Sequence, residues 1–193
     1  DYAPAAFVMD NAIWFMASGN QNCPIYKSEN PKYGQWQLVC DTFPLAVTDP
    51  AFFLDNDNRL YFYWGCSNKN PIMGVELDRE TFMPKGEPDS LIFSNTTQNG
   101  WENPGDYNEL TAQAPWIEGP SMIKQNGRYY LHYAGPGTEY KSYADGIYVS
   151  DSPLGGFKLA KFNPMAYKPE GFINGIGHGC TFTDMHGNYW HIG

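Results

Sequence analysis

Three ionisable side chains stand at matching positions of a repeated sequence pattern. Asp49 opens the segment "DPAFFLDNDNRLYFYWG", His178 opens "HGCTFTDMHGNYWHIG", and Glu118 lies one residue before "GPSMIKQNGRYYLHYA". Ordinary turn chemistry accounts for one Asp before a proline. It does not readily account for an Asp, a Glu and a His at matching corners. Because carboxyl and imidazole groups can exchange protons with a substrate, these corners are candidate site positions.

The repeat that contains these corners predicts β-hairpins. A fourth copy, "APAAFVMDNAIWFMAS", begins at Ala3. In each copy a small-residue or proline corner leads into about four extended apolar-rich residues, the chain turns at Asp, Asn or Gly, and an aromatic strand returns. Asn and Gly tolerate the positive φ that tight hairpin turns require. A further strand pair follows three of the copies, as in "NPIMGVELDRETFMPKGEP" and "DGIYVSDSPLGGFKLA", so a repeat predicts a four-stranded sheet.

Repeated four-stranded units are typical of a β-propeller. In a propeller the innermost strands all run the same way and line a central channel, so their first residues converge on one mouth of that channel. We therefore predict that Asp49, Glu118 and His178 meet, although they are far apart in the chain. The alternative interpretation is a β-sandwich whose hairpins resemble one another by accident.

Composition supports an all-β fold and excludes some partners. Aromatic residues make up 17% of the 193 residues, as much as the charged residues do, and there are 20 Gly and 15 Pro, which favours strands and turns over long helices. A net charge of −9 with only 12 Lys and Arg argues against nucleic-acid binding. No apolar run approaches the roughly 18 residues of a membrane span. The four cysteines show no zinc-like spacing, and their disulfide state stays open.

Four motifs, taken in chain order, resemble glycoside hydrolase family 43. They are "DPAFFLDNDNRLYFYWG", "EGPSMIKQNGRYYLHYA", "YADGIYVSDSPLGGF" and "GHGCTFTDMHGNYWHIG", and the opening "YAPAAFVMDNAIWFMAS" is similar to the family's second blade. The resemblance covers most of residues 1–193. It implies a partial catalytic domain from an all-β, five-bladed propeller. About four blades, the second to the fifth, would begin near residues 3, 49, 118 and 178, and the first blade would be missing.

The resemblance also implies roles for the corner residues. Glu118 would be the general acid, and Asp49 the carboxylate that orients it and modulates its pKa. His178 would be the central histidine of the substrate site, near a calcium ion in the channel that is held largely through water; no other cofactor is required. The family's general base is an Asp of the first blade. Neither Asp1 nor Asp10 fits that role, so the base is expected upstream of Asp1.

The implied function is inverting hydrolysis of terminal or side-chain α-L-arabinofuranosyl or β-D-xylosyl linkages in plant polysaccharides. Such a reaction needs an acid on the departing oxygen and a base that activates water on the opposite face. Other readings are a galactose-active member of the family, a non-catalytic carbohydrate-binding or scaffold propeller, and a four-bladed relic without its base. Fructan-active propellers fit less well, because the acid here lies in Glu-Gly-Pro rather than Glu-Cys. The expected location is extracellular or periplasmic, although no signal peptide is seen.

Three aromatic residues are candidates for stacking on a sugar ring: Phe52, Trp101 and Trp116. A core position is the alternative for each. Trp101 lies in the polar insertion "NTTQNGWENPGDYNEL", which gives no reason to bury it, so we expect it at the rim of the site. His132 is expected to be a core histidine, with the site lining as its alternative. His186 and His191 are expected in surface or packing roles.

Overall fold

The prediction of an all-β chain is confirmed by the computed structural model, which describes residues 2–18 and 22–193. Two short 3₁₀ helices, η1 (Pro31–Tyr33) and η2 (Gly100–Glu102), interrupt the strands. No helix in these two ranges has the length and apolar character needed to cross a bilayer. The strands are β1 (Tyr2–Met9), β2 (Ala12–Ser18), β3 (Ile25–Asn30), β4 (Gln35–Cys40), β5 (Ala51–Leu54), β6 (Leu60–Trp64), β7 (Cys66–Ser67), β8 (Ile72–Leu77), β9 (Asp89–Ile92), β10 (Ile117–Gln125), β11 (Arg128–Gly135), β12 (Ala144–Ser150), β13 (Lys158–Leu159), β14 (Ala166–Tyr167), β15 (Cys180–Thr183) and β16 (Tyr189–Ile192).

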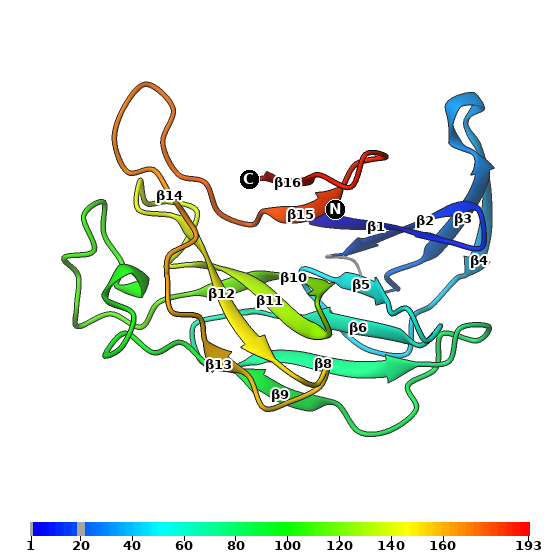
Figure 1. The fold of residues 1–193 in the computed structure, drawn as a ribbon, viewed down its shortest axis with the longest axis horizontal. Helices are drawn as coiled ribbons and strands as arrows, with labels where there is room; N and C mark the ends of the chain where they lie inside the picture. The colour runs from blue at the N-terminus through cyan, green and yellow to red at the C-terminus, as the bar shows by residue number, and fades with distance from the viewer. Residues whose placement is uncertain (1, 19–21) are drawn as a thin grey trace.

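The strands form separate antiparallel sheets that follow one another along the chain (Figure 1). The first sheet has the order β1-β2-β3-β4 and the second β5-β6-β8-β9. The third has the order β13-β12-β11-β10-β7, with β14 also paired to β12. Strands β15 and β16 form a two-stranded sheet. Strand β7 follows the second strand of the second sheet in sequence but pairs with the third sheet, so it ties the two sheets together.

The sequence repeat corresponds to a repeated backbone corner. Ala3, Asp49, Gly119 and His178 all have positive φ, at +42°, +54°, +56° and +59°. Residues other than glycine seldom adopt this conformation. In β1 and β10 the strand pairing shifts register at this point, as at a β-bulge. Glycine occupies the corner of the third sheet, which is why Glu118 is displaced by one residue from the position that Asp49 and His178 take.

Turn residues close the first and third hairpins as expected. Asp10 and Asn11 have φ of +52° and +57° between β1 and β2, and Asn126 and Gly127 have φ of +51° and +78° between β10 and β11. Two central residues with positive φ match the right-handed twist of the flanking strands. The turns therefore fix the register of both hairpins.

Strand β6 lies at the centre of the packing between sheets. Leu60 and Phe62 belong to the core cluster between the first and second sheets, whereas Tyr61 and Tyr63 belong to the cluster between the second and third. Successive side chains of a strand point to opposite faces, so one strand supplies both cores. All four are fully or almost fully buried. This packing holds the start of β5 next to the start of β10.

Trp101 is a correction to the sequence analysis, because it lies in the core and not at an exposed rim. Its side chain is 9% exposed and packs on Tyr133, with ring centroids 5.5 Å apart. It also covers Gly146, where an added Cβ would come within 2.5 Å of the indole. The insertion is polar, but its polar groups bond to each other: Asn99 donates to the buried carboxylate of Glu102. A polar loop satisfied in this way can fold inward and bury its tryptophan.

Candidate active site

The structure brings the three corner side chains together. The backbone N–H of Gly119 donates to Oδ2 of Asp49 at 3.3 Å, and Nδ1 of His178 lies 3.7 Å from the same oxygen. Ligand atoms of Asp49, Glu118 and Cys66 all lie within 4.8 Å of one another. Residues separated by most of the chain thus meet at one mouth.

Local backbone geometry explains this convergence. Cys66 on β7 and Glu118 on β10 are direct pairing partners. Because β7 directly follows β6 of the second sheet in the chain, this pairing brings the second sheet next to the carboxyl group of Glu118. At Gly119 an added Cβ would come within 2.6 Å of the His178 ring, and φ is positive. Glycine is therefore required there for two reasons, and its missing side chain lets the imidazole pack against the backbone next to the acid.

Both oxygens of the Glu118 carboxyl group accept a hydrogen bond. The thiol of Cys66 donates to Oε2 at 3.0 Å, and the hydroxyl of Tyr143 donates to Oε1 in a short hydrogen bond. Glu118 itself is 8% exposed. Burial, and then the neighbouring carboxylate, raise the pKa of the Cys66 thiol and of the Tyr143 hydroxyl well above their usual values. Both groups therefore keep their protons at neutral pH and act as donors that orient the carboxyl group.

Asp49 is a buried carboxyl group beside a second one. Its side chain is 5% exposed, and burial raises its pKa. The charge of His178 opposes this shift, while the charge of Glu118 adds to it. The Asp49 carboxyl group can therefore hold its proton in a pH range where an isolated carboxyl group has lost it.

A second polar network supports the corner of the last sheet. Oδ2 of Asp145 accepts the N–H of Gly179 at 3.0 Å and bonds Nε2 of His191 at 2.9 Å. Oγ1 of Thr181 lies 3.0 Å from Nδ1 of His191 and 3.3 Å from Nδ1 of His132. Burial raises the pKa of Asp145 to about 6. The network joins β11 and β12 to β15 and β16 and fixes the backbone immediately after the corner histidine.

The other histidines take the packing and surface roles expected of them. His132 is 2% exposed, and among the described residues its Nε2 has no hydrogen-bond partner. Burial, and then the charge of His191, lower the pKa of His132 to about 4, so its ring is neutral. His191 packs 5.8 Å from it, between ring centroids. His186 is exposed in the β15–β16 turn, where its backbone N–H donates to Asp184.

The two remaining aromatic candidates differ in position. Phe52 is half-buried on β5, stacks on Phe7 at 4.3 Å between centroids, lies 4.8 Å from Phe62, and lines a cavity together with His178. Trp116 directly precedes β10, is 41% exposed, and donates its backbone N–H to the carbonyl of Pro136. Trp116 is therefore the more exposed of the two candidates.

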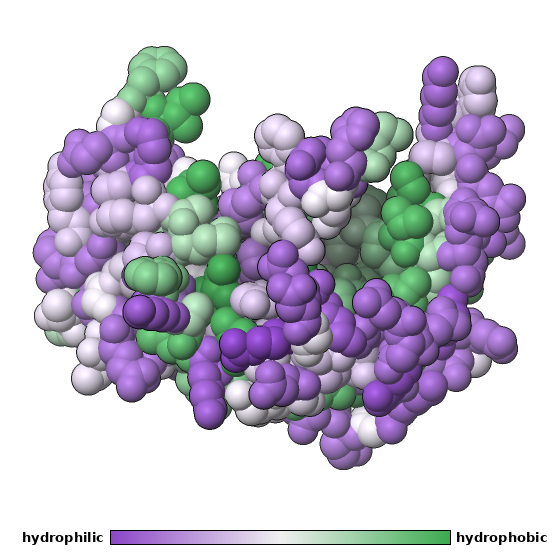
Figure 2. All heavy atoms as spheres, in the orientation of Figure 1, coloured by the Kyte–Doolittle hydropathy of each residue, from purple (hydrophilic) through white to green (hydrophobic). Residues whose placement is uncertain are grey.

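A channel-like cavity of about 310 Å³ runs along the starts of the inner strands. His178, Ser121 and Thr181 are among its lining residues, which include no carboxylate of the described chain. Calcium takes six to eight oxygen ligands. One imidazole and two hydroxyls supply too few oxygen ligands for direct coordination of calcium. Figure 2 shows the surface hollowed between the first sheet, on the right, and the last strands.

A second cavity of about 320 Å³ lies beside Cys66, where β6 ends and β8 begins. This is the same end of the second sheet as Asp49, since neighbouring strands run in opposite directions. Trp64 and Met73 line it with apolar side chains, and Thr48, Ser67 and Asn70 line it with polar ones.

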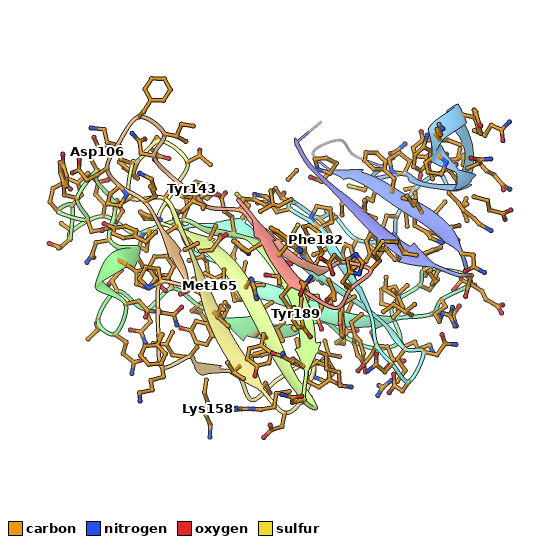
Figure 3. The ribbon with its side chains drawn as sticks, turned by 45° about the horizontal axis from the view of Figure 1, so that its top comes forward. Asp106, Tyr143, Lys158, Met165, Phe182 and Tyr189 are labelled. Atoms are coloured by element: carbon orange, nitrogen blue, oxygen red, sulfur yellow. The ribbon has the colours of Figure 1, made fainter. Side chains whose placement is uncertain are left out.

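Sequence reasoning missed three residues of the site. Tyr143 and Asp145 lie inside the motif "YADGIYVSDSPLGGF", so their place in the motif was a usable signal. Figure 3 shows Tyr143 at the end of β12 that faces away from Lys158, near the loop that carries Asp106. Cys66 gave no signal, because a single cysteine at a strand end has no distinctive spacing. Cys66 is a free thiol, as are Cys40 and Cys180.

The described residues thus define an all-β protein of antiparallel sheets in which two buried carboxyl groups lie close together. The chain belongs to the family described as "Glycosyl hydrolases family 43", whose sequence profile matches residues 1–192. This confirms the family predicted from the motifs.

Individual relatives agree with this family assignment. The chain is 27% identical over 149 residues to the "Beta-D-galactofuranosidase xynD" of Aspergillus niger, covering 74% of this chain and 35% of that protein. Among solved structures it is similar to "Bacteroides ovatus Xyloglucan PUL GH43B", with TM-score 0.79, 21% identity, and coverage of 98% and 35%. An endo-1,4-β-xylanase from Bacteroides thetaiotaomicron gives TM-score 0.78, 23% identity, and coverage of 98% and 63%. The chain spans about a third of the length of the galactofuranosidase and of the Bacteroides ovatus protein. The two solved structures are less than 25% identical to this chain, so they show the fold alone.

Proposed function

We propose that this chain carries the acid half of an inverting glycosidase site that removes terminal or side-chain α-L-arabinofuranosyl or β-D-xylosyl groups from plant polysaccharides. The observation that carries the proposal is the meeting of Glu118 and Asp49 at one mouth. A hydrogen-bond donor on each oxygen of Glu118 supports it, because a positioned carboxyl group is what proton transfer to a leaving group requires. A five-bladed propeller is the fold proposed for the complete domain.

In the proposed reaction Glu118 gives its proton to the departing glycosidic oxygen as the bond to the sugar breaks. The Asp49 carboxyl group lies beside it and is proposed to orient it. Cys66 and Tyr143 hold the carboxyl plane through their hydrogen bonds. His178 lies 3.7 Å from Oδ2 of Asp49 and is proposed to help hold that carboxyl group in position.

The general base is proposed to come from outside residues 1–193. Inversion needs a second carboxylate roughly 6.5–9.5 Å from the acid, with a water molecule between them. Asp10 lies in the β1–β2 turn, where it forms an ion pair with Arg79 at 2.8 Å, so it is held elsewhere. Asp1 lies outside the described residues. The family's pattern, an Asp of the first blade, supports this proposal.

The sugar is proposed to reach the acid through the cavity beside Cys66. Trp64 offers an aromatic surface there, and Asn70 and Ser67 offer hydrogen-bonding groups. Trp116, which is exposed, is the second candidate for stacking on a sugar ring. The net charge of −9 suits a neutral oligo- or polysaccharide better than a nucleic acid. An extracellular or periplasmic location is proposed to go with such a substrate.

A second candidate substrate is a β-D-galactofuranoside. The observation that favours it is the curated relative named "Beta-D-galactofuranosidase xynD". The rings of α-L-arabinofuranose and β-D-galactofuranose have the same configuration, and the sugars differ in the group outside the ring. One acid and one ring-binding surface can therefore serve either sugar, and the neighbouring loops would decide between them.

The test is hydrolysis of aryl α-L-arabinofuranoside, β-D-xyloside and β-D-galactofuranoside by the intact protein. We expect release from one of these classes, with the first-formed sugar having the inverted anomeric configuration by proton NMR. Retention of configuration would contradict the inverting mechanism. Sugar binding without turnover on any of the three would favour the non-catalytic scaffold instead.

A further inference from the structure

The proposed site contains a sulfur atom that proton transfer to a sugar does not require. Cys66 is half-buried, and its thiol contacts the carboxyl group of Glu118 at 3.0 Å. One ligand atom from each of Asp49, Cys66 and Glu118 lies within 4.8 Å of the other two. We propose that these three residues form a binding site for a thiophilic divalent cation of the zinc type.

The three donors are held in place before any ion arrives. Cys66 and Glu118 are pairing partners in adjacent strands, so the distance between their backbones is fixed. Asp49 is attached to the same strand by the hydrogen bond that its Oδ2 accepts from Gly119. Residues already fixed by backbone pairing lose little further freedom on binding, which is the general advantage of a preorganised site.

The donor set selects the kind of cation. Zinc binds thiolate sulfur at about 2.3 Å and carboxylate oxygen at about 2.0–2.2 Å, so neighbouring ligand atoms of a tetrahedral ion lie about 3.5 Å apart. The observed 3.0 Å between Sγ of Cys66 and Oε2 of Glu118 needs only a small outward rotation to match. Calcium and magnesium prefer shells made of oxygen alone, and thiolates select softer ions. We therefore expect zinc and cadmium to bind, and calcium and magnesium not to compete.

Neighbouring groups support this arrangement. Tyr143 occupies Oε1 of Glu118 and leaves Oε2 turned toward the sulfur. His178 lies 3.7 Å from Oδ2 of Asp49, beside the ion's position but outside the three donors. Hydrogen bonds to ligating carboxylates hold them in orientation. Three protein donors leave a fourth position of the tetrahedron for water, and the cation takes the place of the thiol proton.

The consequence for activity rests on the proposed function, whereas the binding itself does not. A cation held by Glu118 ties up the carboxyl group that would give its proton to the leaving oxygen. Metal binding and sugar cleavage then exclude each other. Zinc would act as a reversible inhibitor, and a chelator would restore the activity.

The experiment is a cadmium titration of the intact protein, followed by the ultraviolet charge-transfer absorption of the cadmium–thiolate bond. We expect one equivalent of this signal to be lost in Cys66→Ser and kept in the matched control Cys40→Ser, whose thiol lies on β4 of the first sheet. Zinc should displace the cadmium, and calcium at the same concentration should not. Glu118→Gln keeps the thiol and should weaken binding at least about tenfold, no less than loss of a supporting partner does.

Two results would overturn the proposal. One is a full signal in Cys66→Ser, and the other is unchanged cadmium affinity in Glu118→Gln. Circular dichroism checks that Cys66→Ser is folded, and if it is not, the affinity of Glu118→Gln decides. Hydrolysis is measured separately: cadmium binding by a protein that cleaves none of the sugars refutes the proposed function alone, while cleavage with no cadmium signal refutes the metal site alone.

Discussion

Two buried glutamates of this chain are surrounded by hydrogen-bond donors in different ways. Glu102 is fully buried and accepts hydrogen bonds from Asn99, from the Tyr133 hydroxyl and from the backbone N–H of Asn95. No second carboxyl group is among these partners. Its position in η2 anchors the insertion under which Trp101 is buried. Both oxygens of Glu102 thus accept hydrogen bonds from within the protein, and these hydrogen bonds stabilise the fold.

Glu118 is the contrasting case. It has one donor on each oxygen, a second carboxyl group beside it, and a cavity next to one of its donors. Two carboxyl groups in one buried place cost stability, since their charges repel and both resist desolvation. Carboxyl groups in such surroundings cluster at functional sites. The two glutamates are both buried, and what distinguishes them is the groups that surround each carboxyl group.

The largest expected effect is that of Glu118→Gln. Without its proton donor the enzyme should lose about 10²–10⁴-fold in kcat on sugar leaving groups, and less on aryl glycosides whose leaving groups need little protonation. Steady-state kinetics on both substrate types measure the difference, and the melting temperature should change little. Equal losses on both substrate types would remove Glu118 from the acid role.

Glu102→Ala tests the other side of the comparison. It removes the acceptor that Asn95, Asn99 and Tyr133 share and should lower the free energy of unfolding by about 3 kcal/mol. Urea unfolding measures this, and the kcat of the folded fraction should be unchanged. A loss of activity without loss of stability would show that the two glutamates do not differ in kind.

Glu102→Gln is the control for charge. Burial raises the pKa of Glu102. Between the usual carboxyl range and the raised value, the folded protein keeps a proton that the unfolded chain has lost, so stability falls as pH rises through that window. Gln cannot titrate, so the fall that this group causes should disappear in the variant.

Asp49→Asn tests whether the two carboxyl groups act as a pair. Asparagine keeps the shape of Asp49 and removes its titratable group, so we expect the pH–rate profile to shift along the limb to which Asp49 contributes. The motivating observations are that ligand atoms of Asp49 and Glu118 lie within 4.8 Å and that burial, with the charge of Glu118 adding to it, raises the pKa of Asp49. A profile with an unmoved limb would take Asp49 out of the assignment.

Tyr143→Phe should have the smallest effect. The variant keeps the ring and loses only the hydroxyl that orients Oε1 of Glu118. One orienting hydrogen bond is worth about 1 kcal/mol, or roughly fivefold in kcat. Tyr133→Phe is the matched control, because it removes the corresponding donor to Glu102 and should change stability instead of rate.

Part of this site could be predicted from local sequence. Asp49 and His178 follow the repeat because each sits at a corner with positive φ, and such corners have a sequence signature in small residues, prolines and turns. The motif around Glu118 was sufficient to predict the family. Cys66 and Tyr143 could not be placed in the same way, since neither occupies a repeated position.

The sequence by itself determined the hairpins and the family, because turn chemistry and strand periodicity act over a few residues and repeat along the chain. The meeting of Asp49, Glu118 and His178 could be predicted because all three follow that repeat. Only the tertiary structure decided that Cys66 lies against the acid and that Trp101 turns inward. Both depend on contacts between segments far apart in sequence, and burial of a side chain is a property of those contacts rather than of its neighbours in the chain.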